Sequence, residues 1–353
     1  MTVYINGRFF SQRVTGVQRV AREILKELDK NLIETDEEFI ILVPKGTKVD
    51  LLFSNIKIRE IGLFRGHFWE QISLPFVTYR NKLINFCNTA PILKRKQVAY
   101  IHDAAVFSKP DGYSKLFVIW YKILFKLIIR YSKAIVTVSE FSKEEIIKYF
   151  QIPGHKINVT HIAANNFQEI NADTNVLNKF GLMNTDYVLA VSSLHPNKNF
   201  NLIIEAIKDM DIPIDIVIAG GANNKIFSGH EIEALSHVKS VGYVSDEELK
   251  ALYENAEAFV FPSLYEGFGL PPLEAMTVGC PVLASKAASI PEICGEAALY
   301  FDPHSKEELL KLISMVYRNK DLVLELKQKG IKQSKRYHWT FTAKQVLEII
   351  KKV

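Results

Sequence analysis

Short apolar runs rich in Val, Ile and Phe alternate with segments of helical period along almost the whole chain. In the first half the predicted strands are VYIN, FIILVP, KLINFC, VAYIHD and AIVTVS; in the second half they are YVLAVSS, DIVIAGG, VKSVGYV, AFVFPS, CPVLAS and ALYF. Helical segments between them include GVQRVAREILKELDK, SKEEIIKYF, NLIIEAIKDM and DEELKALYENA. Because strands alternating with helices form parallel sheets covered by helices, we predict an α/β fold of two Rossmann-like units.

The alternation pauses once, over residues 163–184, which are polar and rich in Asn. We predict a hinge there, between a first domain over residues 1–170 and a second over residues 180–336. Residues 337–353 follow the last predicted strand and have a helical period. We expect this terminal helix to cross back to the first domain.

The charge of the chain is distributed unevenly. Residues 1–180 hold 26 Lys and Arg against 17 Asp and Glu, a balance of +9, whereas the remainder holds 18 against 22, a balance of −4. A basic first half predicts an anionic partner for that half, such as lipid headgroups or a phosphate-bearing acceptor. We expect no nucleic-acid partner, because no recognition helix, zinc-type spacing or aromatic RNA-binding signature is present.

Cysteine usage and hydropathy predict the compartment. Cys87, Cys280 and Cys294 are odd in number and lack metal-type spacing, which argues against a disulfide framework and for a reducing, cytosolic environment. No apolar run approaches the roughly 20 residues that span a bilayer, and the start MTVYINGRFF has no signal-peptide core. We therefore expect a cytoplasmic protein.

The stretch SLYEGFGLPPLEAM places two glutamates around a pair of glycines and a pair of prolines. Glu266 follows the predicted strand AFVFPS, on the edge of a parallel sheet where ligands bind. Pro272 suits the first turn of the next helix, which puts Glu274 within that turn. The pattern predicts that an anion binds at the helix start, between the two carboxylates. A nucleotide sugar has its groups in that order, with the diphosphate between the sugar and the ribose.

EGFGLPPLEAM resembles the E-x7-E segment of the retaining glycosyltransferases of family 4, which have the GT-B fold: two Rossmann-like domains with parallel sheets facing across a hinged cleft. The resemblance implies an acceptor-side first domain and a nucleotide-sugar-binding second domain. It also implies that Glu274 binds the nucleotide ribose, and that the donor sugar contacts Glu266, Gly267, Phe268, Gly269 and Leu270. The family uses a nucleotide sugar as co-substrate and works without a bound metal, so we expect no cofactor.

Other segments of the second half resemble the same family. In VSSLHPNKNFNLIIEAI, Lys198 stands where a lysine supports the diphosphate, because a cation must stabilise the charge that builds up when the sugar leaves. Many relatives carry an arginine either where this chain has Ser193 or directly before the lysine, where it has Asn197, and Ser193 is assigned to donor binding. AGGANNK and VGYVSDEEL resemble segments that line the nucleotide pocket, which assigns Gly220, Tyr243 and Val244 to donor binding.

The first half supplies a second group of candidates. AYIHDAAVF places His102 and Asp103 at a strand end, and the resemblance makes His102 a donor-sugar contact near the reacting carbon. Asp103 is a candidate contact for the acceptor. In NGRFFSQRVTGVQRVAREI, Gly16 begins a helix and resembles the glycine loop that approaches the diphosphate. Arg19 lies one turn further and is a candidate contact for the acceptor, whereas Arg8 is expected on the solvated surface.

The triplet DMD, residues 209–211, resembles the metal-binding motif of the other large glycosyltransferase fold. It precedes a predicted strand instead of following one, so we interpret it as a turn. No metal-binding residue is predicted.

The segment YSKLFVIWYKILFKLIIRYSK has five basic residues within a stripe of about 80° on a helix. The remaining apolar arc is wider than a core-facing surface helix needs. Such a helix either packs on several sides or leans into a membrane with its lysines at the headgroups. The basic first half favours peripheral contact with an anionic inner-membrane surface.

The resemblance implies a retaining hexosyltransferase of the mannosyl- and rhamnosyltransferase-like branch of bacterial surface-polysaccharide synthesis. The expected acceptor is a lipid-linked glycan at the cytoplasmic face, in assembly of O-antigen, capsule or exopolysaccharide. GDP-mannose is the first expected donor, followed by dTDP-rhamnose and UDP-sugars. A nucleotide-sugar epimerase of the same architecture and a non-catalytic nucleotide-sugar sensor are the alternatives.

Overall fold

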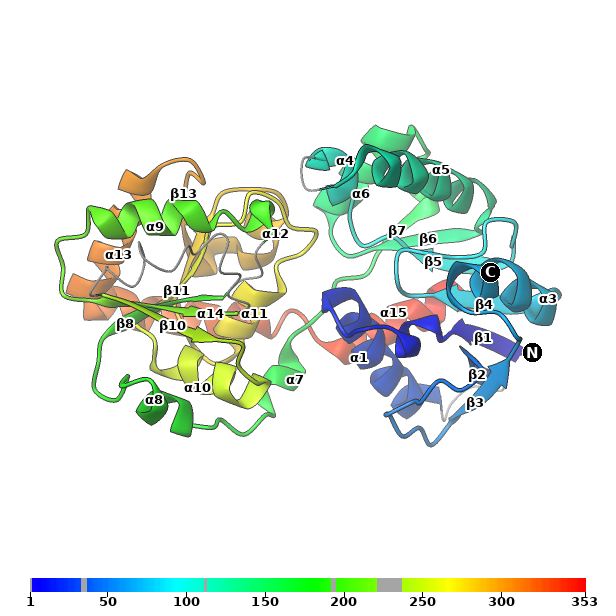
Figure 1. Ribbon diagram of the computed structural model, residues 1–353, viewed down its shortest axis with the longest axis horizontal. Coiled ribbons are helices and arrows are strands. Elements are labelled where there is room, and N and C mark those ends of the chain that lie inside the picture. Colours follow the sequence, from blue (N-terminus) through cyan, green and yellow to red (C-terminus); the bar gives the residue numbers. More distant parts are fainter. Residues whose placement is uncertain (1, 33–36, 111–112, 192–194, 221–236) are drawn as a thin grey trace. The chain divides into compact units, whose positions relative to one another are not determined.

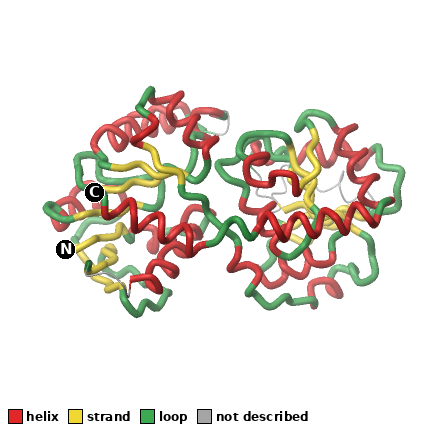
Figure 2. The backbone as a smooth tube through the Cα atoms, turned by 180° about the vertical axis from the view of Figure 1, so that it is seen from behind, coloured by secondary structure: helices red, strands yellow, loops and turns green. Residues whose placement is uncertain are grey.

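The computed structural model describes residues 2–32, 37–110, 113–191, 195–220 and 237–353 (Figure 1). The chain forms two compact units, the first from residues 1–162 and 339–353 and the second from residues 163–338. In each unit helices enclose a single parallel sheet, as the red and yellow segments of Figure 2 show.

The first sheet has seven strands in the order β3-β2-β1-β4-β5-β6-β7. They are β1 (Thr2–Asn6), β2 (Glu38–Pro44), β3 (Ile56–Ile61), β4 (Lys82–Asn85), β5 (Gln97–Tyr100), β6 (Ala134–Thr137) and β7 (Ile157–Val159). The sequence pattern predicts the five inner strands but not β3 and β7. These two lie at the edges, where β3 exposes its four central residues and β7 has only three residues, so neither gives a long apolar run.

The helices of the first unit pack against both faces of its sheet. They are α1 (Gly16–Asn31), α2 (Gly66–Phe68), α3 (Leu74–Thr78), α4 (Ala105–Ser108), α5 (Lys115–Tyr131), α6 (Glu140–Phe150) and α15 (Trp339–Lys351), with the π-helical turn η3 (Trp69–Ser73) joining α2 to α3. Figure 1 shows α15 side by side with α1. The terminal helix is tied further to this unit because Lys82 Nζ donates to the Ile350 carbonyl, at 2.9 Å, and Thr342 Oγ1 donates to the His161 carbonyl, at 2.6 Å.

The second sheet has six strands in the order β10-β9-β8-β11-β12-β13. They are β8 (Tyr187–Val191), β9 (Asp215–Ala219), β10 (Val238–Gly242), β11 (Ala258–Phe261), β12 (Val282–Ser285) and β13 (Ala298–Phe301). Alternate residues of these strands enter two core layers: Phe259 and Phe261 lie in one, and Val260 lies in the other. Burial on both faces explains why the sequence shows these strands as continuous apolar runs.

The helices of the second unit complete those two layers. They are α7 (Asn165–Gln168), α8 (Asn175–Lys179), α9 (Phe200–Lys208), α10 (Asp246–Asn255), α11 (Leu270–Thr277), α12 (Ile290–Cys294), α13 (Lys306–Arg318) and α14 (Lys320–Ser334). One layer contains residues of α10 and α11, and the other contains residues of α9 and α13.

The boundary between the units differs from the predicted hinge. It falls between residues 162 and 163, and the Asn-rich stretch that follows belongs to the second unit. Phe167, Val176 and Leu177 from this stretch are buried in the core of that unit. A few apolar residues on two short helices are enough to anchor a segment whose average composition is polar.

Candidate active site

The strand order of the second sheet reverses between β8 and β11, and the predicted donor residues Lys198 and Glu266 lie in the segments that follow these strands. The chain leaves β8, passes the 3-10 turn η6 (Pro196–Lys198) and enters α9. It leaves β11 through the loop that carries Glu266 and enters α11. A crevice outside the carboxyl ends of strands at such a switch point is where open α/β sheets bind ligands.

Lys198 and Glu266 meet at this point. Lys198 Nζ donates to Glu266 Oε1 at 2.6 Å, and the two side chains are 25% and 15% exposed. The same Nζ lies 5.4 Å from the centre of the Phe261 ring. This places a cation and a carboxylate next to each other, both still accessible to a ligand.

Backbone contacts hold the loop that carries Glu266. Ser289 Oγ lies 2.9 Å from the Glu266 carbonyl oxygen and 2.8 Å from that of Phe268, so its single hydroxyl proton can be donated to either or shared between them. The Leu264 amide donates to the Asn197 carbonyl at 2.7 Å, which joins this loop to η6. Ser289 was not predicted as a site residue, because it lies 23 and 21 residues beyond Glu266 and Phe268, the two residues that it supports.

Asn199 is a second residue that the sequence analysis missed. Its φ is +53°, and its side-chain amide donates to the carbonyls of Pro262, at 3.2 Å, and Pro303, at 2.7 Å. Asparagine is one of the few side chains that tolerate this left-handed conformation. The residue therefore fixes the start of α9 against the loop after β11, and the Asn that ends PNKN was the available signal.

The start of α11 differs in part from the prediction. Gly269 precedes the helix with φ +109°, a conformation that favours glycine, and Pro271 and Pro272 follow in the first turn. The prolines have no N–H, so Leu270 is the residue among these three whose amide can donate. Glu274, 6% exposed, lies in the second turn rather than the first, because the helix begins at Leu270.

Phe268 contributes to the core as well as to the loop. Its ring is buried and packs edge-on against Tyr337, with ring centres 5.6 Å apart. Gly267 lies in the same loop, one residue after Glu266. The predicted sugar-binding loop is thus anchored at its centre by an aromatic side chain.

The predicted nucleotide-pocket residues lie after β9 and β10. Gly220 has φ +125°, and its amide donates to the Gly242 carbonyl at 2.7 Å, which ties the ends of the two strands together. Tyr243 is exposed, and Val244 packs against the core. Ser193 and most of AGGANNK lie outside the described residues.

His102 is buried at the carboxyl end of β5 in the first unit. Its Nε2 lies 2.7 Å from the Phe86 carbonyl oxygen, and its amide donates to Asn88 Oδ1 at 2.8 Å. Burial lowers the pKa of His102 to about 4, although the bond to Phe86 opposes that shift. The ring is therefore neutral near pH 7, with its proton on Nε2 and with Nδ1 as the acceptor.

The other first-unit candidates begin helices. Asp103 Oδ1 accepts from the Ala105 amide at 2.9 Å, at the start of α4. Gly16 begins α1, as predicted, and a Cβ there would meet nothing within 4 Å. Arg19 lies in the same helix, one turn further along. His102, Asp103, Gly16 and Arg19 belong to the first unit, and the remaining predicted site residues belong to the second.

Arg8 is buried, contrary to the expectation that it is solvated. Its Nε lies 3.4 Å from Glu70 Oε1, and its Nη2 donates to Thr89 Oγ1 at 2.9 Å. Glu70 is fully buried, and it also accepts from Asn6 and Thr89. No sequence pattern points to this partner, because Glu70 lies on a helix 62 positions further along the chain.

The triplet DMD lies between α9 and β9, in the predicted turn region. Asp209 forms an ion pair with Lys306 at 2.5 Å. In the described part of the chain, no group of three or more His, Cys, Asp and Glu side chains is arranged to hold a metal ion. Nor does that part contain a helix long and apolar enough to cross a membrane.

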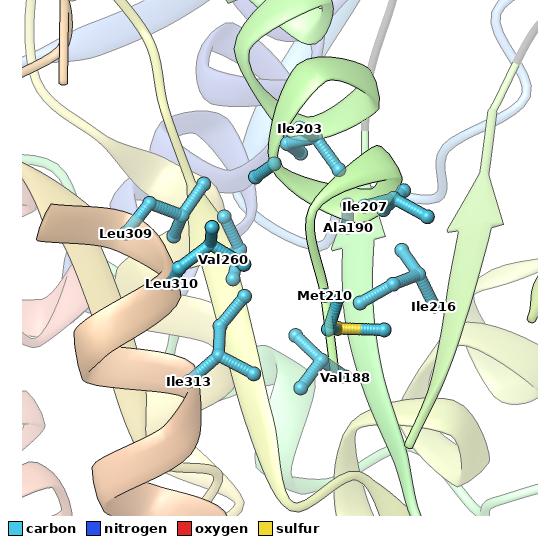
Figure 3. Close-up of a pocket in the computed structure, with 11 residues that line it drawn as sticks. Val188, Ala190, Ile203, Ile207, Met210, Ile216, Val260, Leu309, Leu310 and Ile313 are labelled. Atoms are coloured by element: carbon cyan, nitrogen blue, oxygen red, sulfur yellow. The ribbon is translucent and has the colours of Figure 1, made fainter. Parts of the chain in front are cut away.

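A small void lies inside the second unit, between α9, α13 and the sheet (Figure 3). Its volume is about 10 Å³, and its lining is apolar, with Ile203, Ile216 and Ile313 among the side chains that point into it. A space of this size without polar partners does not hold an ordered water. It is a packing void and not a ligand site.

Two protein families match the chain, one in each unit. Residues 174–333 match the family described as Glycosyl transferases group 1, and residues 76–163 match the family described as Glycosyltransferase Family 4.

Two curated mannosyltransferases are similar to the chain in sequence. The O-antigen chain mannosyltransferase B of Escherichia coli is 29% identical over 273 residues, which cover 72% of this chain and 70% of that protein. The serotype-specific mannosyltransferase WbdA of Escherichia coli is 29% identical over 380 residues, which cover 97% of this chain and 44% of WbdA. The chain therefore spans less than half the length of WbdA.

Solved structures of low sequence identity share the fold. Sucrose-phosphate synthase from Thermosynechococcus elongatus superposes with a TM-score of 0.78 at 14% identity, over 99% of this chain and 98% of that one. HepE from Anabaena, in complex with UDP and glucose, superposes with a TM-score of 0.75 at 15% identity, over the full length of both chains. The predicted fold class is confirmed: the chain has the GT-B fold of two Rossmann-like units with parallel sheets, and its units match glycosyltransferase families, Family 4 in the first and group 1 in the second.

Proposed function

We propose that the protein transfers a hexose or deoxyhexose from a nucleotide sugar to a lipid-linked glycan, in assembly of O-antigen, capsule or exopolysaccharide. Mannose from GDP-mannose is the first candidate, supported by the mannosyltransferase relatives at 29% identity. The complex of HepE with UDP and glucose supports a nucleotide sugar as the donor. The observation that carries the proposal is the Lys198–Glu266 pair at the switch point of the second sheet.

The proposed reaction proceeds on one face of the sugar, with retention of configuration. The bond between the anomeric carbon and the diphosphate oxygen breaks, the acceptor oxygen bonds to the same face, and the acceptor proton passes to the leaving diphosphate. Lys198 stabilises the charge that develops on the diphosphate, and Glu266 holds the sugar. His102 is too weak a base at neutral pH to take that proton fully, so its proposed role is to accept a hydrogen bond from a sugar hydroxyl at Nδ1.

Donor specificity is tested first by nucleotide binding. Thermal-shift titrations with GDP, UDP and dTDP identify the nucleotide class, and the proposal expects the largest stabilisation from GDP. A larger stabilisation by UDP or dTDP would move the donor to that class. No stabilisation by any of the three would contradict a nucleotide-sugar site.

Transfer is then measured with the matching nucleotide sugar and a lipid-linked glycan, and NMR of the product reports the anomeric configuration. We expect an axial-to-axial or equatorial-to-equatorial outcome, unchanged activity in EDTA and no conversion of the donor when the acceptor is left out. Activity lost in EDTA and restored by manganese would contradict the metal-free mechanism. Donor isomerised without acceptor would indicate the epimerase, and binding without any turnover would indicate the sensor.

A further inference from the structure

An open cavity of about 580 Å³ lies in the first unit at the carboxyl ends of β1 and β2. Its lining comes from the segment after β1, the turn after β2 and the start of α2. We call it the basic cavity, because its lining includes the basic residues Arg8, Lys45, Lys48 and Arg65. None of the described residues that line it is acidic.

Three of these four basic side chains are available to a ligand. Lys45, Lys48 and Arg65 are exposed, and they form no ion pair with any residue in the described parts of the chain. Arg8 is already neutralised by Glu70. Uncompensated ammonium and guanidinium groups around one concavity fit a phosphate or diphosphate, whose oxygens accept several charged hydrogen bonds.

Two carboxylates lie near the basic cavity, and neither forms an ion pair with Lys45, Lys48 or Arg65. Asp50, two residues after Lys48, pairs with Arg22 at 2.8 Å. Glu60 lies with Lys45 in the wall of an adjoining cavity and accepts from the Gly46 amide at 3.2 Å.

An exposed apolar stripe begins where the basic cavity ends. From Arg65 the chain continues through α2, η3 and α3 as one helical segment. We define the apolar stripe as its outer residues, which are exposed to 72%, 50%, 87% and 79%: Phe68, Ile72, Phe76 and Tyr79. Their spacing of four, four and three positions places them on one face.

The opposite face of this segment is fixed in the core. Trp69, Glu70, Leu74 and Thr78 are fully buried, and Trp69 Nε1 donates to the Ile61 carbonyl at 2.8 Å. The segment therefore cannot turn to bury the apolar stripe. Large apolar patches on a single chain mark surfaces that contact another partner.

The surroundings of the apolar stripe favour an anionic membrane as that partner. Residues 61–133 contain twelve Lys and Arg and three Asp and Glu, one of which is the buried Glu70. Basic residues beside exposed apolar side chains suit an anionic bilayer surface, because the cations bind headgroups while the apolar groups enter the interface.

Helix α5 lies on the same face of the first sheet as the apolar stripe. Residues paired in register point to one face of the sheet, and so do residues two positions apart in a strand. The pairs Tyr4–Leu83 and Leu83–Gln97 link β1, β4 and β5, and the pair Ala99–Ile135 links β5 and β6. Gln97 and Ala99 are two positions apart in β5, so all of these residues share one face. Leu74 of α3 packs with Tyr4 and Leu83, and α5 packs with Ala99 and Ile135.

Helix α5 is buried along one side and exposes apolar residues on another. Its inner residues Leu124, Phe125, Ile128 and Ile129 are buried, as a packed helix requires. Its first turns expose apolar residues as well as lysines, namely Leu116, Ile119, Trp120 and Ile123. The helical layer on this face thus presents apolar side chains from two of its segments.

We propose that the basic cavity binds the phosphate groups of a membrane-borne acceptor while the apolar stripe enters the adjoining bilayer interface. This rests on the proposed transfer to a lipid-linked glycan and adds the residues that would receive the acceptor. A phosphate carried by a lipid brings its charge and its apolar chain to a protein together. The basic cavity and the apolar stripe adjoin at Arg65 and Gly66, which matches that arrangement.

The membrane half is tested by co-sedimenting the full chain with vesicles in which about a third of the lipid is phosphatidylglycerol. We expect Phe68→Ser with Phe76→Ser to weaken binding roughly tenfold or more, because two large apolar contacts are lost. Leu324→Ser is the matched control, since Leu324 is 56% exposed but lies in α14 of the second unit. Melting temperatures verify that all variants fold.

Two results would overturn the proposed contact between the apolar stripe and the membrane. One is binding unchanged by the double substitution or reduced equally by Leu324→Ser. The other is binding that survives the double substitution but disappears in Leu116→Ser with Ile119→Ser, which would assign the contact to α5 alone.

The cavity half is tested by calorimetric titration with inorganic pyrophosphate, on protein saturated with its nucleotide so that the donor diphosphate site is filled. We expect one remaining site, weakened at least tenfold by Lys45→Gln, Lys48→Gln and Arg65→Gln together. Lys311→Gln, an exposed lysine of α13, is the control and should change nothing. Absence of a remaining site, or a site insensitive to the triple substitution, would overturn the assignment.

The outcomes separate this inference from the proposed function. If nucleotide binds but neither vesicles nor pyrophosphate bind as stated, the inference fails and the glycosyltransferase proposal stands. If no nucleotide binds, the proposed function fails, and the pyrophosphate titration of Lys198→Ala protein still tests the basic cavity. Pyrophosphate binding without vesicle binding would indicate a soluble phosphorylated ligand and contradict the membrane-borne acceptor.

Discussion

At the scale of single residues, Lys198 and Glu266 combine partial exposure with a short charged hydrogen bond. Each can exchange its partner for a ligand group without losing all of its stabilisation, which suits a site that must bind and release a charged donor. Glu274 is different, because it is almost completely buried in the second turn of α11. A buried carboxylate is costly unless it is hydrogen-bonded. If Glu274 binds the nucleotide ribose, as the resemblance implies, its substitution should affect nucleotide binding more than turnover.

The two glutamates should respond differently to substitution. We expect Glu266→Gln, which can still accept from Lys198, to lower kcat while the affinity for free nucleotide is retained. Glu274→Ala should instead weaken free nucleotide about ten- to a hundredfold, since a hydrogen bond to a charged group is worth roughly 1.5 to 3 kcal/mol. Steady-state kinetics and nucleotide calorimetry measure the two effects, and equal losses of nucleotide affinity would contradict the division of roles.

His102 should make stability depend on pH in the acidic range. Its pKa is lowered to about 4 in the folded protein from 6.5, so below pH 6.5 the unfolded chain binds a proton that the folded chain does not. The free energy of unfolding should therefore fall between pH 6.5 and 4, by on the order of 2 kcal/mol for this group. Urea unfolding at pH 7 and 4.5 measures the loss, and His102→Asn should reduce it; an identical pH dependence in the variant would rule out His102 as the source.

At the scale of elements, helix starts carry most of the candidate site. Gly269 before α11 and Gly16 at the start of α1 look alike in sequence but differ in conformation. Gly269 has φ +109°, whereas Gly16 has an ordinary backbone and open space where a Cβ would be. The first glycine is required by backbone geometry, and only a ligand would require the second.

These two glycines form a matched pair for substitution. Gly269→Ala should lower the free energy of unfolding by about 1 to 2 kcal/mol, because an L residue is strained at this φ. Gly16→Ala should leave stability within about 0.5 kcal/mol, since alanine is the better helix former. If the glycine loop approaches the donor diphosphate as predicted, Gly16→Ala should nevertheless raise KM for the donor; unchanged KM would remove Gly16 from the site.

At the scale of the whole molecule, the first unit is discontinuous and the second is not. Helix α15 completes the first unit from the far end of the sequence and buries Trp339, Ala343, Val346 and Ile350. The second unit has its own two core layers within residues 163–338. The two units should therefore differ in their dependence on the last helix.

Removal of residues 339–353 tests this dependence. We expect the first unit to unfold at a clearly lower temperature, because several buried apolar side chains are lost from its core, while the second unit melts as before. Differential scanning calorimetry should show two separated transitions, and hydrogen exchange should assign the early one to residues 1–162. A single transition that shifts as a whole would show that the units unfold together.

Elements that depend on local pattern could be predicted before the structure was known. Strands buried on both faces, such as β8, β9 and β11, appear as apolar runs, and α1 and α10 appear through their helical period. The E-x7-E motif identified the loop and helix of the candidate donor site, because a glycine with positive φ and prolines in a first turn have sequence signals of their own.

Tertiary packing determines which distant residues meet and which apolar residues stay exposed, and no local pattern predicts either. Ser289 supports Glu266, and Glu70 buries Arg8, through contacts between segments that carry no trace of each other in sequence. The same limit applies to Phe68 and Trp69, which are adjacent and both aromatic, yet one is 72% exposed and the other fully buried. Composition cannot distinguish them, because burial depends on the direction that a side chain takes from a helix already packed against its sheet.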